Sequence, residues 1–241
     1  MSLFASAEMA AGYAKARPPV HARILERANL KRAARALDVG SGAGVSTQAL
    51  SAYAHQCIGV EPVAAMAHSV CAAAEALPFA DQTFALATAA GSLNYVSDLD
   101  ASFAEVARVL RPGAWFVVYD FSAGKRFADG DPTLSEWFAQ FQARYPNPPA
   151  GSARVLDPGR LAHLCGPRFR PAHSEILEIV LELSPGFYLN YMLTETNVAY
   201  AVEQGAASLS EIRDWCAATL WRGAPRKVAF DGYYACFVRL P

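Results

Sequence analysis

Residues 37–44 read Leu-Asp-Val-Gly-Ser-Gly-Ala-Gly, a short apolar strand that ends in a glycine-rich turn and opens a helix. Glycine lets the backbone pass close beneath a ligand, and the first turn of the following helix supplies N–H groups that have no partner inside the helix. A turn of this kind indicates a ligand site. The candidate cofactor-binding residues within it are Gly40, Ser41, Gly42 and Gly44.

The segments on both sides of this turn alternate between helix and strand patterns. Apolar residues at helical spacing predict a helix over residues 21–34, and a strand at 36–40 follows directly. Downstream we expect helices near 45–54, 62–68 and 100–110, and strands at 57–61, 69–74, 84–89 and 114–121. Strands separated by helices of this length pair in parallel through right-handed crossovers. The sequence therefore predicts a doubly wound α/β sheet.

The alternation of helix and strand stops after Asp120. Residues 122–170 carry many Pro, Gly and aromatic residues, and the pattern predicts one helix among them at 132–145. Further along we expect a strand at 174–183, an aromatic stretch at 185–200, a helix near 208–221 and a final strand at 226–239. We interpret residues 122–170 and about 185–205 as helical cap insertions within a single domain that spans residues 1–241.

The composition favours a folded protein without a polyanionic partner. Hydrophobic residues make up 53% of the 241 residues, which is enough apolar surface to offset the entropy of ordering the chain. Lys and Arg number 21 against 22 Asp and Glu, so the formal charge of −1 gives no field that would attract nucleic acid. We expect no nucleic-acid partner.

The sequence also predicts a soluble, cytoplasmic protein with no membrane partner. The first 19 residues lack the pattern of a secretory leader, and no charge-free apolar run reaches the roughly 18 residues that a membrane helix requires. The five cysteines are scattered, which is typical of reduced, buried thiols. His163 and His173 have no neighbours that suggest a metal site, so we assign none.

Two residues near the glycine turn distinguish between cofactors. A dinucleotide-binding fingerprint has the spacing G-x-G-x-x-G, and its third glycine would fall at Val45. The carboxylate of Asp38 also suits a cationic ammonium group better than a pyrophosphate, which it would repel. A nicotinamide-dependent oxidoreductase is therefore the weaker alternative.

From about Tyr13 to Phe121 the sequence resembles the class I S-adenosylmethionine-dependent methyltransferases, in particular the small-molecule group related to the ubiquinone and menaquinone C-methyltransferases. Three elements besides the glycine turn carry the resemblance: Glu61 at the end of the second strand, Ala74-Glu75 before Leu77-Pro78-Phe79, and the run ASFAEVARVLRPGAWFVVYD. The resemblance implies a Rossmann-like sheet of seven mostly parallel strands with an antiparallel C-terminal strand. It also implies S-adenosylmethionine as cofactor and S-adenosylhomocysteine as product.

The resemblance assigns roles to residues outside the turn as well. Glu61, followed by Pro62, takes the position of the acidic residue that chelates the ribose hydroxyls with charge-assisted hydrogen bonds. Ala74 and Glu75 match the segment that reads the adenine edge, and Ala90 and Gly91 would lie beside the methionine part of the cofactor. Tyr13 falls in the lid region. Ala85, Asn94 and Tyr95 depart from the residues that are common in this family.

The candidate catalytic residues are Tyr95, Asp120 and His21. Methyl transfer from a sulfonium is an in-line displacement, so the protein mainly aligns the reactants and excludes water, and a general base helps if the acceptor must lose a proton. Tyr95 and Asp120 lie near the carboxyl ends of predicted strands, where open α/β sheets hold their ligands. A purely structural role remains the alternative for each of the three.

Aromatic residues in the insertions suggest an apolar or aromatic small-molecule acceptor. The residues concerned are Trp137, Phe138, Phe141 and Tyr145 on the first insertion helix, and Tyr188, Tyr191 and Met192 in the second insertion. The alternative is ordinary packing of a helical cap. We expect a monomer or homodimer. A protein that binds the cofactor without catalysis remains a second interpretation, because catalysis here requires little from side chains.

Overall fold

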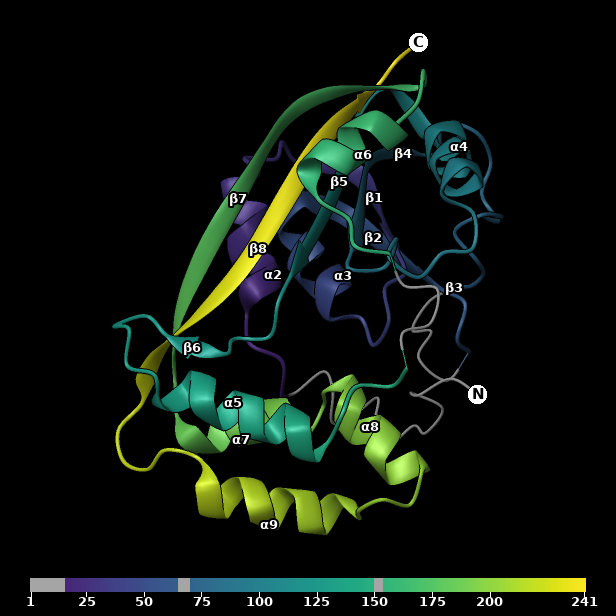
Figure 1. The fold of residues 1–241 in the computed structure, drawn as a ribbon. Helices are drawn as coiled ribbons and strands as arrows, with labels where there is room; N and C mark the ends of the chain where they lie inside the picture. Colours follow the sequence, from purple (N-terminus) through teal and green to yellow (C-terminus); the bar gives the residue numbers. More distant parts are fainter. Residues whose placement is uncertain (1–15, 65–69, 150–153) are drawn as a thin grey trace. The chain divides into compact units, whose positions relative to one another are not determined.

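The computed structural model describes residues 16–64, 70–149 and 154–241, and Figure 1 shows their fold. The strands in these residues are β1 (Ala33–Val39), β2 (Ala54–Glu61), β3 (Val70–Cys71), β4 (Phe84–Ala90), β5 (Leu110–Phe121), β6 (Arg126–Phe127), β7 (Phe169–Leu183) and β8 (Arg226–Arg239). The helices are α2 (Val20–Arg27), α3 (Val45–Leu50), η1 (Ser51–Tyr53), α4 (Leu99–Val109), α5 (Thr133–Arg144), α6 (Pro158–Leu164), α7 (Pro185–Met192), α8 (Thr196–Glu203) and α9 (Leu209–Thr219).

The strands form one sheet with the order β3-β2-β1-β4-β5-β8-β6, and β7 also pairs with β8. Neighbouring strands from β3 to β5 are parallel, whereas β8 runs antiparallel to β5. The predicted doubly wound, mostly parallel α/β sheet with an antiparallel C-terminal strand is confirmed. Eight strands replace the expected seven in the described residues, because the two residues of β6 add a short ladder along β8.

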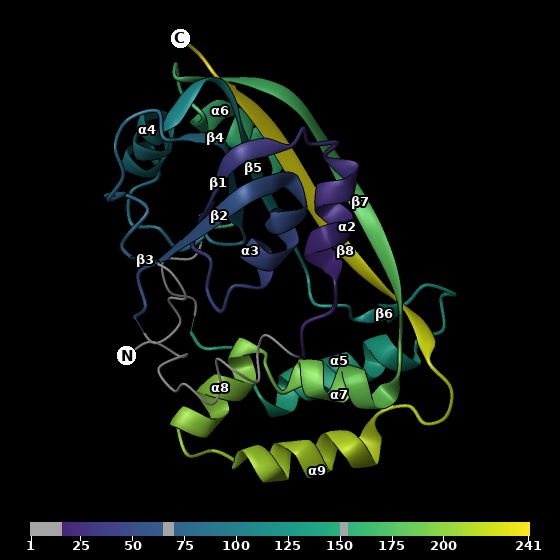
Figure 2. The ribbon, with the colours of Figure 1, turned by 180° about the vertical axis from the view of Figure 1, so that it is seen from behind.

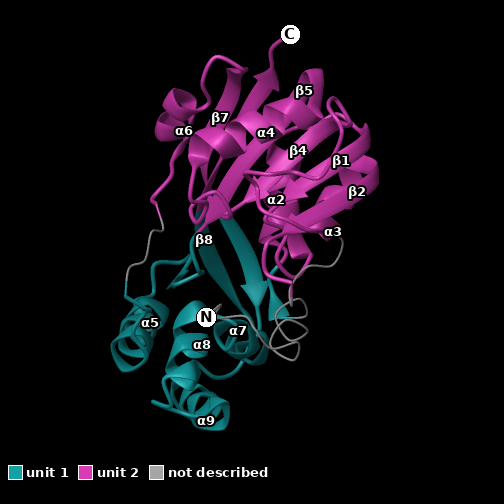
Figure 3. Cartoon of the chain, turned by 90° about the vertical axis from the view of Figure 1, so that its right-hand side faces the viewer, with its two compact units in different colours: residues 1–18, 122–151, 178–231 teal, residues 19–121, 152–177, 232–241 magenta. Residues whose placement is uncertain are grey.

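The chain folds into two compact units, which Figure 3 shows in different colours. Unit 1 comprises residues 1–18, 122–151 and 178–231, and unit 2 comprises residues 19–121, 152–177 and 232–241. Residues 152–177 therefore fold with unit 2, although their composition placed most of them in the first cap insertion. That the chain acts as a single domain stays a prediction.

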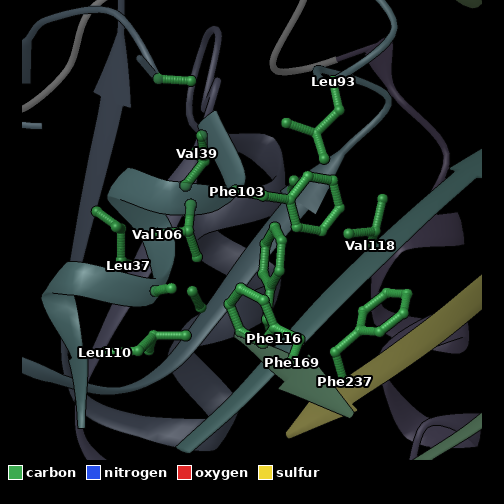
Figure 4. Close-up of a cluster of buried hydrophobic side chains, with 14 of the residues drawn as sticks. Leu37, Val39, Leu93, Phe103, Val106, Leu110, Phe116, Val118, Phe169 and Phe237 are labelled. Atoms are coloured by element: carbon green, nitrogen blue, oxygen red, sulfur yellow. The ribbon is translucent and has the colours of Figure 1, made fainter. Parts of the chain in front are cut away.

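The core of unit 2 forms between the sheet and α4. The view in Figure 1 shows α4 and α6 on one side of the sheet, and Figure 2 shows α2 and α3 on the other. On α4, Phe103 and Val106 are 4% and 0% exposed, and Phe103 meets the ring of Phe116 on β5 edge to face at 5.6 Å (Figure 4). Such ring pairs add to the free energy of burial. This packing holds the strand ends of unit 2 in fixed positions.

The predicted end of the first helix and the predicted start of the fifth strand are wrong. The first helix ends at Arg27 instead of residue 34, because Asn29 adopts a left-handed conformation (φ 51°) that stops the helix. The strand predicted at 114–121 also begins earlier, ahead of Pro112 and Gly113. Strand β5 already begins at Leu110, and its pairing with β4 shifts register between Phe84 and Leu86 to accommodate the irregularity.

Unit 1 is built around interlocked aromatic rings. Trp137 on α5 stacks on Phe141 at 5.2 Å and on Trp215 of α9 at 5.7 Å, and its ring N–H donates to Thr219 Oγ1 at 2.9 Å. The residues expected to line an acceptor pocket are all at most 7% exposed: Trp137, Phe138, Phe141, Tyr145, Tyr188, Tyr191 and Met192. These side chains form the hydrophobic core of unit 1, as expected if the residues serve the packing of a helical cap.

No helix among the described residues has both the length and the apolar character that a membrane span requires.

Candidate functional site

Each glycine of the turn between β1 and α3 has a left-handed backbone, with φ of 70° at Gly40, 49° at Gly42 and 85° at Gly44. A Cβ at Gly40 would lie 2.2 Å from Cβ of Ser92, so this position excludes any side chain. The N–H groups of Gly40 and Ser41 both donate to the carbonyl oxygen of Val60 on β2, at 2.8 and 2.9 Å. The turn is therefore a rigid backbone feature between two strand ends.

Asp38 lies under this turn and not at its surface. Its side chain is fully buried and accepts hydrogen bonds from the hydroxyls of Ser46 (2.6 Å), Thr47 (2.7 Å) and Thr88 (2.9 Å). Burial raises the pKa of this carboxyl, and the three hydroxyls partly oppose that rise. The structure thus gives Asp38 hydroxyl partners in place of the ammonium group that the sequence suggested. Its observed role is to fasten the start of α3 to β1 and β4.

Glu61 brings a carboxylate to the glycine turn from the end of β2. Its Oε2 accepts from the N–H of Gly42 at 3.1 Å, and its Oε1 accepts from the N–H of Val63 at 3.0 Å. The side chain is 9% exposed, and each oxygen keeps further lone-pair capacity. Pro62, the next residue, is exposed. The two backbone donors fix the carboxylate in one orientation beside Gly42.

Glu75 is placed near the start of α4. Its Oε1 accepts from both the N–H and the hydroxyl of Ser97 at 2.8 Å, while Ala74 beside it is buried in the core. Burial alone would raise the pKa of Glu75, but the hydrogen bonds from Ser97 and Asp98 outweigh it and lower the pKa. Glu75 therefore holds the loop after β4, a role that its position in the sequence did not reveal.

The end of β4 approaches the end of β5 closely. The N–H of Gly91 donates to the carbonyl oxygen of Tyr119 at 2.8 Å, and a Cβ at Gly91 would lie 2.8 Å from Oδ1 of Asp120. The hydroxyl of Ser92 donates to the carbonyl oxygen of Val39 at 2.5 Å, which joins the end of β4 to the end of β1. Ala90, the last residue of β4, is half-buried. These contacts require a glycine at position 91.

Asp120 is the candidate catalytic carboxyl at the end of β5. The side-chain amide of Asn94 donates to its Oδ2 at 2.7 Å, and the N–H of Phe121 donates to its Oδ1 at 2.8 Å. Burial raises the pKa of Asp120, and these two hydrogen bonds limit the rise. A half-buried carboxyl with a raised pKa is a better proton acceptor near neutral pH than an exposed one.

The other two catalytic candidates lie in different settings. His21 on α2 contacts the hydroxyl of Tyr119 through Nδ1 at 3.1 Å, and its ring meets Phe121 edge to face at 5.0 Å. Tyr119 is 1% exposed, and burial raises its pKa well above the usual value. Tyr95 is 67% exposed on the loop after β4. Tyr13 lies outside the described residues.

Parallel pairing brings the remaining candidates together. The register pairs Val39 with Val60 and with Ala89, and Ala90 with Tyr119, so the turns after β1, β2, β4 and β5 meet at the carboxyl edge of the sheet. Clusters of His, Cys, Asp or Glu that could hold a metal ion are absent from the part of the chain that the structure describes. The sequence analysis did not identify the hydroxyl groups that bond to Asp38. It also did not identify Arg154, which bonds to the loop after β4 from a segment that is distant in the sequence. No local motif marks either.

A sheet of this order with a ligand turn after its first strand defines the class of α/β proteins that bind a nucleoside cofactor at the carboxyl edge. Residues 37–118 match the family described as the methyltransferase domain. Over these residues the sequence is thus similar to methyltransferase domains. The resemblance to the class I S-adenosylmethionine-dependent methyltransferases is confirmed.

Individual relatives agree with this assignment. The chain is 30% identical over 129 residues to the uncharacterized methyltransferase YcgJ of Bacillus subtilis, covering 47% of this chain and 49% of that protein. It is 32% identical over 108 residues to a demethylmenaquinone methyltransferase of Corynebacterium urealyticum, covering 42% and 47%. The chain thus spans about half the length of the curated relatives it matches.

Solved structures resemble the whole described fold. A protein described as a type II methyltransferase, from Anaeromyxobacter dehalogenans, is 25% identical, with 93% of this chain and 97% of that chain covered and a TM-score of 0.62. The structure of YcgJ from Bacillus subtilis shows the same fold at 21% identity, with coverage of 92% and 98% and a TM-score of 0.50.

The residues at the carboxyl edge fit S-adenosylmethionine, the cofactor of this family. The hydroxyl oxygen of Ser41 is buried and has no hydrogen-bond partner among the residues that the structure describes. A buried polar atom without a partner is costly unless a ligand or water satisfies it. Beside it, Gly40 and Gly42 leave the backbone bare, and Glu61 presents a fixed carboxylate. A fixed carboxylate beside bare backbone suits the hydroxyl groups of a nucleoside.

Proposed function

We propose that this protein binds S-adenosylmethionine at the glycine turn of unit 2 and transfers its methyl group to a small molecule. The observation that carries the proposal is the placement of Glu61 against Gly42, at 3.1 Å, within a segment that matches the methyltransferase domain. A carboxylate held by two backbone donors is oriented before the ligand arrives, which lowers the entropic cost of binding.

Five of the cofactor-binding candidates have a role in this proposal. Glu61 accepts hydrogen bonds from ribose hydroxyls, and Ser41 supplies a buried hydroxyl that has no partner in the described part of the chain. Gly40 and Gly91 keep the backbone bare where side chains would collide with Ser92 and Asp120. Asp38 acts indirectly by fastening α3. When bound, the cofactor supplies a methyl group on an activated sulfonium, so the protein needs no residue to activate it.

Asp120 is the residue that we propose as proton acceptor. Its carboxyl lies beside Gly91 and is oriented by Asn94. Only the ionised carboxylate accepts a proton, and burial raises its pKa, so the rate should fall as the pH decreases through that raised pKa. Tyr95 and His21 remain candidates for contacts with the acceptor. A pH–rate profile that loses its acidic limb in Asp120→Asn would identify Asp120 as the base.

The acceptor that we propose is apolar or aromatic. The printed names of two relatives support this class: a demethylmenaquinone methyltransferase, and a sterol 4-C-methyltransferase of Caenorhabditis elegans that is 33% identical over 117 residues. Both names denote molecules with large apolar skeletons. The aromatic residues of unit 1 no longer support this class, because they pack on one another.

Calorimetry with S-adenosylhomocysteine tests the binding step. Replacing Glu61 by Gln removes a charge-assisted acceptor, which should weaken binding about 10- to 100-fold. Glu203→Gln changes an exposed glutamate of α8 in the same way and should leave the affinity unchanged. Absence of heat with the wild-type protein, or equal affinity in both variants, would contradict the proposed cofactor site.

A mass-spectrometric screen of methyl acceptors tests the transfer step. Turnover of an apolar acceptor that is lost in Glu61→Gln supports the enzyme. Binding of S-adenosylhomocysteine with no turnover of any acceptor would instead favour a protein that binds the cofactor without catalysis. Binding of reduced nicotinamide cofactor alone would favour an oxidoreductase.

A further inference from the structure

The loop after β4, residues 92–98, carries two of the site's side chains and is held by three parts of unit 2. Asn94 bonds to Asp120, and Tyr95 is 67% exposed. Ser92 fastens the start of the loop to Val39, and Glu75 fastens its end at Ser97. The middle of the loop needs a separate anchor, because its carbonyl groups are not part of any helix or strand.

Arg154 provides that anchor from a segment that is distant in the sequence. Its N–H donates to the carbonyl oxygen of Asn94 at 2.8 Å. Its guanidinium donates through one terminal nitrogen to the carbonyl oxygen of Val96 and through the other to that of Ser97, at 3.0 Å. One residue therefore satisfies three carbonyl groups of the loop.

The backbone of Arg154 is itself held in place. Leu156, two residues further on, is 7% exposed and belongs to the same hydrophobic cluster as Leu93 of the loop. The planar guanidinium presents its donors in a fixed fork, which suits two adjacent carbonyl groups better than the single ammonium of lysine. The contact is thus specific for arginine.

We propose that Arg154 is a positioning residue that holds the loop after β4 so that Asn94 keeps Asp120 in its productive orientation. The catalytic meaning of this contact rests on the proposed function, in which Asp120 accepts a proton. The physical coupling does not, because it runs through hydrogen bonds within unit 2: from Arg154 to the loop backbone, and from Asn94 to Asp120.

Titration of the Asp120 carboxyl by carbon-13 NMR measures the coupling without any acceptor. The hydrogen bond from Asn94 favours the ionised form of Asp120, so Asn94→Ala should raise the pKa of this carboxyl. The groups that face Asp120 and could also shift it are Tyr119 on the same strand and Tyr233 on β8. Neither tyrosine is substituted in the variants described below.

Arg154→Ala should raise the pKa of Asp120 in the same direction as Asn94→Ala but by less, because the backbone bond from residue 154 to Asn94 remains. Arg154→Lys, which keeps the charge but not the fork, should fall between Arg154→Ala and the wild type. The matched control is Arg111→Ala, which removes an exposed guanidinium that donates to the carbonyl oxygen of Gln82 at 3.0 Å, near the opposite end of β5 from Asp120. This control should leave the titration of Asp120 unchanged.

Amide hydrogen exchange gives a second measurement on the same proteins. Loss of the guanidinium contacts in Arg154→Ala should speed exchange of the Ser97 amide about tenfold, the effect of roughly 1.4 kcal/mol of lost protection. Arg154→Lys serves the same purpose if the alanine variant does not fold. An unchanged Asp120 titration in Arg154→Lys and Arg154→Ala, beside a shifted one in Asn94→Ala, would overturn the positioning role. Failure of the proposed function would appear separately, because calorimetry would then detect no binding of S-adenosylhomocysteine to the wild-type protein.

Discussion

The two units of the molecule use glycine and aromatic residues in opposite ways. In unit 2, the candidate site is made by backbone: three glycines with positive φ between β1 and α3, and Gly91 beside Asp120. In unit 1, the helices are held by side chains, with Trp137 stacked on Phe141 and Trp215. A backbone site tolerates few substitutions at fixed positions, whereas a packed core tolerates many that keep its volume.

This difference separates binding from stability. Unit 2 places its chemistry at the ends of strands that the hydrophobic cluster around Phe103 and Phe116 keeps rigid. The aromatic side chains of unit 1 pack on one another and stabilise that unit. Substitutions of matched size in the two units should therefore affect different measurements.

The largest effect on stability should come from Trp137→Ala. This change removes a ring that is 5% exposed and a hydrogen bond to Thr219, so the free energy of unfolding of unit 1 should fall by about 3–5 kcal/mol. Thermal unfolding followed by circular dichroism measures the loss. The affinity for S-adenosylhomocysteine of the folded fraction should stay constant. A tenfold weaker affinity would show that the packing of unit 1 also affects cofactor binding in unit 2.

The next effect should come from Gly40→Ala, with Gly113→Ala as its matched control. Both glycines have positive φ, 70° and 78°, so each alanine should cost about 1–2 kcal/mol in backbone strain. At residue 40 the new Cβ would collide with Ser92, whereas a Cβ at residue 113 would meet none of the described residues within 4 Å beyond its two chain neighbours.

Calorimetry of the two glycine variants distinguishes the effect of the collision at Gly40 from the effect of backbone strain, which both variants share. Gly40→Ala should weaken S-adenosylhomocysteine binding by about tenfold or more, the equivalent of 1.4 kcal/mol, because the turn and the start of the loop after β4 must move apart. Gly113→Ala should bind as the wild type does. Equal affinities would mean that the close approach of Gly40 to Ser92 does not shape the site.

Sequence patterns predicted the fold of unit 2 well because its elements are marked locally. Apolar strands and the glycine turn at residues 40–44 are signals within a few residues, and the parallel order follows from connection lengths. The sequence patterns failed where contacts with distant residues determine which unit a segment belongs to. The composition of residues 154–170 is typical of an insertion, but these residues belong to unit 2, because they pack on a core that is distant in the sequence.

The candidate site was predictable to a similar extent. The sequence placed Asp120 and Glu61 at strand ends, and the structure puts both at the carboxyl edge of the sheet. It could not show that Asp38 faces inward, since burial of a strand residue depends on Ser46 and Thr88 opposite it. Arg154 was invisible for the same reason, because its three carbonyl partners lie more than 50 residues earlier in the chain.

The smallest effects should come from two helix caps, one in each unit. Asp98 accepts from the N–H of Ala101 at 3.0 Å to begin α4, and Ser208 accepts from the N–H of Glu211 at 3.2 Å to begin α9. Replacing either by alanine should cost about 1 kcal/mol of stability, measured by denaturant unfolding.

The two cap variants should differ in binding, although their costs are similar. Asp98 ends the loop that Arg154 and Glu75 hold, so Asp98→Ala should loosen residues 92–98 and weaken S-adenosylhomocysteine binding a few-fold. Ser208→Ala leaves that loop untouched and should not change the affinity. If both variants bind equally well, the order of the loop does not matter for the cofactor, and the role of Arg154 is confined to Asp120.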